Sequence, residues 1–363
     1  AEAMRSGWLT TGPNATAFER EFAEFLGTDA QAVAVNSATA GLHLAFEAIG
    51  VGPGDEVLVP TWTFTSTAEA VRYLGGDPVL VDVDPATLCI DLADAARKVT
   101  GRTVAVAPVH YAGLAVPNAA LTEFAARHGL RVVEDAAHAF PTVNEGTPVG
   151  AHGHAATVYS FYATKTMTTG EGGMVITPDE DLAARMRTMR LHGIDRDVFD
   201  RYSSTRPSWH YDVVAPGYKY NLTDTAAAMG RVQLRRAPEM VARRTTIAAR
   251  YDEAFRGLPV TLPARPAEGS THAWHLYNLR LAADAPVSRD RFIALMAEAG
   301  VGTSVHFIPL HLQPYWRDTY GHAPEDFPVA SAEFERSVSL PIFSAMTDDD
   351  VEKVVATTAE ILG

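Results

Sequence analysis

The chain has 363 residues, of which 47% are hydrophobic and 20% charged, so it is long enough to bury a large core and to form two domains. Its formal net charge of -14 argues against nucleic acid as a partner, because such binding depends on clustered Lys and Arg. The sequence shows no apolar run long enough to cross a bilayer and no basic leader before a hydrophobic stretch. We therefore expect a soluble, cytoplasmic protein with no membrane partner, and we predict no metal site.

Short β-branched runs alternate with helical patterns in the first half of the chain. The predicted strands are residues 33–35, 56–59, 79–83, 104–109, 132–134, 157–161 and 174–176. One intervening helix is capped by Ser37 and ended by Gly50, and another covers residues 119–128 and stops at Gly129. Such alternation is typical of a mostly parallel sheet with helices on both faces. The sequence therefore predicts an α/β fold with a mostly parallel, seven-stranded sheet.

The pattern changes at about residue 225, where a long helical stretch rich in Ala and Arg begins. The elements expected after it are a strand at 275–281, a helix opened by Ser288, a strand at 303–307 and a last helix with a capping box of Thr347 and Asp350. We predict a large domain over residues 1–235 and a smaller α+β C-terminal domain over residues 236–363. The polar stretch 195–216 is expected to be a long functional loop.

The chain has four lysines, whose surroundings can be compared directly. Lys98 and Lys353 lie on polar helical faces, as solvated cations do, and Lys219 lies beside the predicted loop. Lys165 alone follows a buried-looking strand and precedes a glycine-rich turn, which is where an α/β sheet presents groups to a ligand. Most lysines in loops are only solvated, but an amine in this position can form an imine with an aldehyde cofactor.

An acidic residue, Asp135, ends the apolar strand that begins at residue 132. A carboxylate there is costly to desolvate unless it has a cationic partner. The protonated pyridine nitrogen of pyridoxal 5'-phosphate (PLP) is such a partner, and its protonation makes the ring an electron sink. The alternative is that Asp135 caps a following helix. His138, one helical turn later, can hydrogen-bond the cofactor's ring oxygen, although a lone histidine near a strand end is more often structural.

Small residues occupy a predicted strand-to-helix turn at 36–41 (NSATAG). Free N–H groups and the helix dipole make such a turn a phosphate site, to which Thr39 and Ser160 add hydroxyl groups. One such turn is weak evidence, because most helices begin near Ser or Thr. Three sites in strand order, with partners for the phosphate, the ring nitrogen and the aldehyde of PLP, are stronger evidence.

With these residues in place, the chain resembles the StrS-type nucleotide-sugar aminotransferases, which are PLP enzymes of the aspartate-aminotransferase fold (fold type I). The resemblance runs nearly end to end and is carried by residues 7–13 (GWLTTGP), 36–40 (NSATA), 60–64 (PTWTF), 108–113 (PVHYAG), 134–138 (EDAAH), 160–165 (SFYATK), 217–224 (GYKYNLTD) and 305–307 (VHF). It implies PLP, and its amino form PMP, as the cofactor.

The resemblance implies a role for each matching residue at the cofactor. It makes Lys165 the imine lysine and the proton shuttle, and it pairs Asp135 with the pyridine nitrogen. Phe64 would stack on the ring. The residues that would hold the phosphate are Ala38, Thr39 and Ser160.

The resemblance also implies a homodimer with shared active sites, because in this family Asn221 would reach the phosphate of the neighbouring subunit. Less specific substrate contacts are Thr10, Thr11, Tyr111, Lys219 and His306. Lys219 and Arg196 are candidate donors to a diphosphate. His306, which lies in a predicted strand, is nearly as well explained by plain packing.

Within the family, the chain is most similar to enzymes that aminate C-4 of a 4-keto sugar, since C-3 enzymes often carry Gln where His138 stands. The implied reaction transfers an amino group from L-glutamate to a nucleotide-linked sugar, with a dTDP-4-keto-6-deoxyhexose favoured, in aminosugar biosynthesis. Alternatives are a C-3 sugar or cyclitol aminotransferase, a PLP-dependent sugar dehydratase, or a silent sugar-nucleotide-binding relative. The related dehydratases have His where this chain has Lys165.

Overall fold

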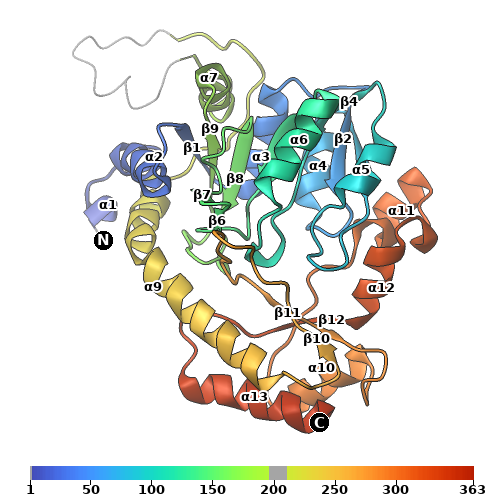
Figure 1. The fold of residues 1–363 in the computed structure, drawn as a ribbon. Coiled ribbons are helices and arrows are strands. Elements are labelled where there is room, and N and C mark those ends of the chain that lie inside the picture. Colours follow the sequence, from blue (N-terminus) through green and yellow to red (C-terminus); the bar gives the residue numbers. More distant parts are fainter. Residues whose placement is uncertain (1, 196–210) are drawn as a thin grey trace.

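The computed structural model describes residues 2–195 and 211–363, and its centre is a seven-stranded sheet (Figure 1). The strands are β1 (Gln31–Val35), β2 (Glu56–Pro60), β3 (Asp77–Val81), β4 (Thr103–Val106), β5 (Arg131–Asp135), β8 (Ala156–Ser160) and β9 (Gly173–Thr177). Their order is β1-β9-β8-β5-β4-β2-β3, and only β9 runs against the others. The predicted mostly parallel sheet is confirmed, and each predicted run corresponds to one of these strands.

Helices connect the strands and cover the sheet (Figure 1). They are α1 (Glu2–Arg5), α2 (Pro13–Leu26), α3 (Ala38–Ala48), α4 (Ser66–Tyr73), α5 (Leu92–Lys98), α6 (Asn118–His128) and α7 (Glu180–Met189). As predicted, Ser37 caps α3, because its Oγ accepts the N–H of Ala40 at 3.1 Å. Gly129 ends α6 with a φ of 67°. No helix in the described ranges is long and apolar enough to cross a membrane.

The two faces of β1 pack into different cores, as the period of two in a strand requires. Val33 and Val35 belong to the core that includes α3. Ala34 faces the other way, into a core that contains Phe18 and Phe22 of α2. Burial of each Phe side chain stabilises the fold by roughly 1.5–3 kcal/mol. The sheet edge is therefore fixed between two layers of helices, which holds the ends of its strands in place.

The reversed strand β9 brings two parts of the predicted phosphate site together. Gly173, at its start, pairs with Val35 of β1 on one side and with Ser160 of β8 on the other. A Cβ atom at Gly173 would lie 2.8 Å from the carbonyl oxygen of Tyr159 and 2.9 Å from the backbone nitrogen of Ala38. Only glycine therefore lets the N-terminus of α3 approach β8 this closely.

The C-terminal part contains a second, antiparallel sheet with a core of its own. Its strands are β10 (Val260–Thr261), β11 (Tyr277–Leu281) and β12 (Ser337–Leu340), and its helices are α10 (Arg289–Glu298) and α13 (Asp348–Leu362). Ser288 caps α10, and Thr347 and Asp350 form a capping box at α13. The predicted α+β arrangement and these two helix starts are confirmed.

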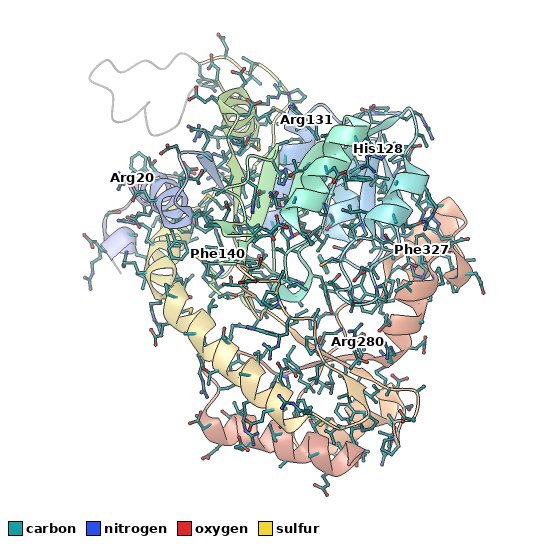
Figure 2. All side chains as sticks on the ribbon, viewed as in Figure 1. Arg20, His128, Arg131, Phe140, Arg280 and Phe327 are labelled. Carbon is teal, nitrogen blue, oxygen red and sulfur yellow. The ribbon has the colours of Figure 1, made fainter. Side chains whose placement is uncertain are left out.

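Two further helices, α11 (Pro314–Tyr320) and α12 (Pro328–Arg336), return to the large sheet. Trp316 and Ala330 belong to the core of that sheet, and the labelled Phe327 lies beside α12 (Figure 2). Lys98 of α5 sits 4.4 Å from the centre of the Phe327 ring. The remaining short elements are β6 (Val143–Asn144), β7 (Thr147–Pro148), and 3-10 turns at Tyr111–Gly113, Leu310–Leu312 and Pro324–Asp326.

The predicted strand at 303–307 is wrong. Of these residues, Ser304 makes one isolated bridge, to Ser339 of β12. The carbonyl oxygen of His306 instead accepts hydrogen bonds from Trp62 Nε1 at 2.9 Å and from the Tyr111 hydroxyl at 2.5 Å. These donors come from the large sheet's side, so the segment is fixed by side chains across the two parts rather than by a strand ladder.

A single helix, α9 (Asp224–Ala254), joins the two parts and runs from α2 to α13 (Figure 1). Leu234 packs in the core around α2, and Tyr251 packs in the C-terminal core. The predicted domain boundary at residue 235 falls inside this helix and stays a prediction. Most of the predicted loop at 195–216, including Arg196, lies outside the described residues. At its base, Ile194 forms a bridge with Val213.

We predict that Gly173→Ala lowers the free energy of unfolding by about 1–3 kcal/mol, because the added methyl group meets backbone atoms that cannot move independently. Urea unfolding followed by circular dichroism measures the change. Gly101→Ala is the matched control, since a Cβ there meets no heavy atom within 4 Å. Equal stability of the two variants would show that the close approach at Gly173 does not constrain the fold.

Candidate active site

The predicted cofactor residues, with the exception of Asn221, gather around one cavity of about 470 Å³. It lies where β1, β5 and β8 end and β9 begins. The predicted residues that line it are Ala38, Thr39, Phe64, Asp135, His138, Ser160, Lys165 and His306. Parallel strands present their carboxyl ends at one edge, which explains why residues so far apart in sequence meet here.

Lys165 lies in the turn after β8 and is the lysine that lines this cavity. Burial lowers its pKa from 10.5 to about 8, and the nearby charge of Asp135 opposes that shift. The other three lysines are engaged elsewhere. Lys98 pairs with Asp94, Lys219 donates to Asn221, and Lys353 donates to the carbonyl oxygen of Gly300. A lysine amine that is partly neutral near neutral pH is a competent nucleophile and base.

Asp135 ends β5, and 5% of its surface is exposed. Its Oδ2 accepts the hydroxyl of Thr67 at 2.7 Å, and its Oδ1 accepts the N–H of Ala137 at 3.0 Å. Residues 136–141 form turns and irregular backbone rather than a helix, so the alternative of a helix cap is wrong. Both of these donors are neutral, and a buried carboxylate with neutral donors fits the protonated nitrogen of a flat heterocycle. Thr67, which orients the carboxylate, was not predicted from the sequence.

Small residues at the N-terminus of α3 form another part of the cavity wall. Because Ser37 caps Ala40, the first N–H groups of the helix, at Ala38 and Thr39, have no intrahelical acceptor. Ser160, which is 8% exposed, pairs with Gly173, and Gly173 in turn lies against the backbone nitrogen of Ala38. Open N–H groups, the positive end of the helix dipole and two hydroxyls together fit a phosphate.

His138 is buried in the wall between Asp135 and the C-terminal part. Burial, with the charge of Lys165 as a second cause, holds its pKa well below the usual value, so the ring is neutral. Its Nδ1 accepts the N–H of Ala112 at 3.3 Å, which assigns the ring proton to Nε2. A neutral imidazole of this tautomer can donate a hydrogen bond, and the predicted contact with a ring oxygen of the cofactor stays a prediction.

Two aromatic rings close the cavity. Phe64 is 58% exposed, and its ring centre lies 5.9 Å from that of Phe307. Its open face is available to a second flat ring. His306 lines the cavity, and its Nδ1 is hydrogen-bonded to Ser339 Oγ at 3.0 Å.

His275 also lines the cavity and was missed from the sequence. It was interpreted as the first residue of a strand, but β11 begins only at Tyr277. Its ring centre lies 4.3 Å from that of His138, and its buried Nδ1 has no partner within the described residues. No local pattern distinguishes His275 from a strand residue, because its surroundings are made by distant segments.

The predicted Thr10, Thr11, Lys219 and Asn221 form a second group. Asn221 Nδ2 donates to Thr11 Oγ1 at 2.8 Å, and Asn221 Oδ1 accepts from Lys219 at 2.6 Å. Asn221 also forms a bridge with Val35 at the end of β1. Thr11 and Asn221 line a separate cavity of about 120 Å³. Within one chain, this group is therefore not brought to the Lys165 cavity.

Tyr111 does not line the Lys165 cavity either. Its side chain is 2% exposed, and its hydroxyl donates to the backbone carbonyl of His306. It thus holds the His306 segment in place from behind. The expected contact between Tyr111 and a substrate stays a prediction.

Comparison with known proteins agrees with this geometry. The model of the DegT/DnrJ/EryC1/StrS aminotransferase family matches residues 1–359. The spore coat polysaccharide biosynthesis protein SpsC of Bacillus subtilis (strain 168) is 46% identical over 363 residues, which cover 99% of this chain and 92% of that protein.

Solved structures show the same relationship. The aminotransferase TlmJ of Streptoalloteichus hindustanus has a TM-score of 0.89 and 36% identity, covering 98% of this chain and 93% of that one. The putative sugar aminotransferase Spr1654 of Streptococcus pneumoniae, in its PMP form, has a TM-score of 0.92 and 32% identity, covering 99% and 96%. Spr1654 has also been solved in a PLP form.

These findings confirm the predicted family, fold type and cofactor. The cavity offers an amine, a buried carboxylate and an open helix N-terminus, which fit the aldehyde, ring nitrogen and phosphate of PLP. The chain belongs to the DegT/DnrJ/EryC1/StrS aminotransferase family.

Proposed function

We propose that the chain transfers an amino group from L-glutamate to the C-4 keto group of a nucleotide-linked sugar, in aminosugar biosynthesis. The substrate we favour is a dTDP-4-keto-6-deoxyhexose. The observation that carries the proposal is that Lys165, Asp135 and the N-terminus of α3 line one cavity. The choice of C-4 rests on the sequence resemblance, and in particular on His138 where C-3 enzymes often carry Gln.

Bound PLP would supply an aldehyde carbon and a ring that withdraws electrons from the bonds being broken. Asp135 would accept a hydrogen bond from the ring nitrogen and keep it protonated. Thr39, Ser160 and the first N–H groups of α3 would hold the phosphate, and Phe64 would cover one ring face. These contacts would hold the cofactor within reach of the Lys165 amine.

Lys165 would provide the amine that anchors the cofactor. It would then carry the proton between the substrate carbon that bears the nitrogen and the cofactor carbon derived from the aldehyde. Its pKa of about 8 lets Nζ accept and release a proton near neutral pH. Burial and Lys165 both lower the pKa of His306, so the imidazole beside Lys165 is neutral and does not repel the protonated amine. The same amine therefore performs both proton transfers.

We also propose that the working unit is a cytoplasmic homodimer with shared sites. Asn221, Thr11 and Lys219 form a polar group outside the Lys165 cavity of their own chain. In a dimer, Asn221 would reach the phosphate bound by its partner. This arrangement gives the second polar group a role that a single chain does not offer.

Other reactions are less consistent with the site. A C-3 sugar or cyclitol aminotransferase would use the same cofactor residues and differs only in its substrate. A sugar dehydratase of this fold is disfavoured by the amine at Lys165. A silent binder is disfavoured because it has no need of a buried amine whose pKa is lowered to about 8.

The proposed reaction predicts the outcome of a substrate panel. With glutamate, the purified protein should convert 4-keto sugar nucleotides to products whose mass corresponds to replacement of the keto oxygen by an amine. Lys165→Ala should show no turnover, because it removes the amine. Conversion of only 3-keto substrates would contradict the C-4 assignment, and loss of water without amination would indicate a dehydratase.

The lowered pKa of Lys165 predicts how cofactor attachment depends on pH. The neutral amine is the nucleophile, so the rate of colour formation after adding PLP to the apoprotein should rise roughly tenfold per pH unit and level off above about pH 8. Stopped-flow absorbance measures the midpoint. In Asp135→Asn the midpoint should be lower, because the Asp135 charge raises the pKa. A wild-type midpoint near 10 would show that burial does not act on this amine.

Shared sites predict complementation between two defective variants. Asn221→Asp should weaken PLP binding by charge repulsion in the partner's site, and Lys165→Ala should be inactive. In a re-equilibrated equal mixture with limiting PLP, about one quarter of the wild-type activity should return, because half of the dimers would be mixed and each would hold one intact site. Mixtures no more active than their components would exclude this arrangement.

A further inference from the structure

A second cavity, of about 580 Å³, opens on the other side of Lys165. It lies between α9, the turn after β8, residues 302–306 and residues 339–345. Among the described residues, four line both cavities: Thr164, Lys165, His275 and His306. A reactant in the second cavity would therefore be next to the amine and next to the proposed cofactor site. The size is within the range of small-molecule sites.

The charge of this second cavity is positive, although the chain as a whole carries a net charge of -14. Its charged lining residues are Lys165 and Arg244, and no Asp or Glu is among the described residues that line it. His275 and His306 are neutral, since burial and the Lys165 charge lower both pKa values. A cavity of this kind attracts an anion.

Arg244, on α9, is 4% exposed. Its Nη1 donates to the carbonyl oxygens of Trp274 at 2.9 Å and Ile342 at 2.8 Å, while its buried Nε has no partner within the described residues. Burial lowers its pKa to about 10, so it remains a cation at neutral pH. The carbonyl oxygens therefore accept hydrogen bonds from the Arg244 guanidinium but do not neutralise its positive charge.

The other buried arginines show what is missing at Arg244. Arg190 pairs with Glu19, and Arg280 pairs with Glu333. A buried charge normally has such a partner, because its desolvation is otherwise costly. Thr303 adds a second unsatisfied group, since its buried hydroxyl lines the same cavity and has no partner within the described residues.

We propose that Arg244 and Thr303 bind a carboxylate of the amino donor, which places the donor's amine beside Lys165. This inference rests on the proposed aminotransferase function and extends it to how the donor is recognised. One guanidinium matches one carboxylate. The diphosphate of the sugar nucleotide is the competing anion, but it carries more charge than the one guanidinium of Arg244 would balance.

The two half-reactions allow a direct test on the holoenzyme. In Arg244→Met, the glutamate concentration needed for half-maximal bleaching of the yellow PLP form should rise roughly ten- to a hundredfold, because a charge-assisted hydrogen bond is lost. The reaction of the PMP form with the keto sugar should change less than twofold. Glutarate, which has the carboxylates but no amine, should raise the Tm of the wild type and not of the variant.

Arg243→Met is the matched control. Arg243 is the preceding residue on α9 and also donates to a carbonyl, that of Met346, but it has an ion pair with Asp348. The Arg243→Met variant should therefore show unchanged rates in both half-reactions and the same rise of Tm with glutarate as the wild type. Thr303→Val removes one hydroxyl with little change in volume, and should raise the required glutamate concentration several-fold even if Arg244→Met does not fold.

Each contrary result has a distinct meaning. If Thr303→Val and Arg244→Met each slowed both half-reactions equally, Arg244 would have only a structural role. That result would overturn the proposal. A loss confined to the keto-sugar half-reaction would assign the cavity to the diphosphate and also overturn it. Glutarate binding does not need turnover. A wild type that binds glutarate through Arg244 but performs neither half-reaction would contradict the proposed function and support the anion site.

Discussion

The site depends on two opposite charges that face one cavity without pairing with each other. Asp135 is satisfied by Thr67 and Ala137, which are neutral donors, and Lys165 is pushed toward its neutral form by burial. A direct ion pair would close the space between them. Because Thr67 and the turn after β5 take up the carboxylate's hydrogen bonds, a cavity of about 470 Å³ is kept open for a flat, charged heterocycle.

The geometry of the sheet makes this separation possible. β9 runs against its neighbours, and its glycine at 173 lets the end of β1 and the end of β8 lie on either side of it. The phosphate cradle and Lys165 are consequently tied to the same pair of strands. Asp135 is fixed one strand further along the sheet. The C-terminal part completes the site by presenting His275 and His306. α9 links this part to the first, because Leu234 packs in the core around α2 and Tyr251 packs in the C-terminal core.

The sequence was informative wherever local chemistry determines structure. Short β-branched runs identified the strands of the large sheet, and Ser37 and Thr347 marked helix starts because a cap is a local hydrogen bond. The positions of Lys165 and Asp135 at the cavity were predictable because Asp135 ends a strand and Lys165 follows one. The strand predicted at 303–307 was wrong because this segment is held by side chains that are distant in sequence. Trp62 and Tyr111, which lie 244 and 195 positions before His306, donate hydrogen bonds to its carbonyl oxygen. Thr67, His275 and Arg244 have no local signature, since their partners are brought by the tertiary fold.

The most direct measurement is to locate the lysine that holds the cofactor. Borohydride reduces the bond between the cofactor's aldehyde carbon and its lysine to a stable one, and peptide mass mapping then identifies the modified residue. We expect the reduced cofactor on Lys165. Modification of Lys98, Lys219 or Lys353 instead, or no modification in protein saturated with PLP, would contradict it.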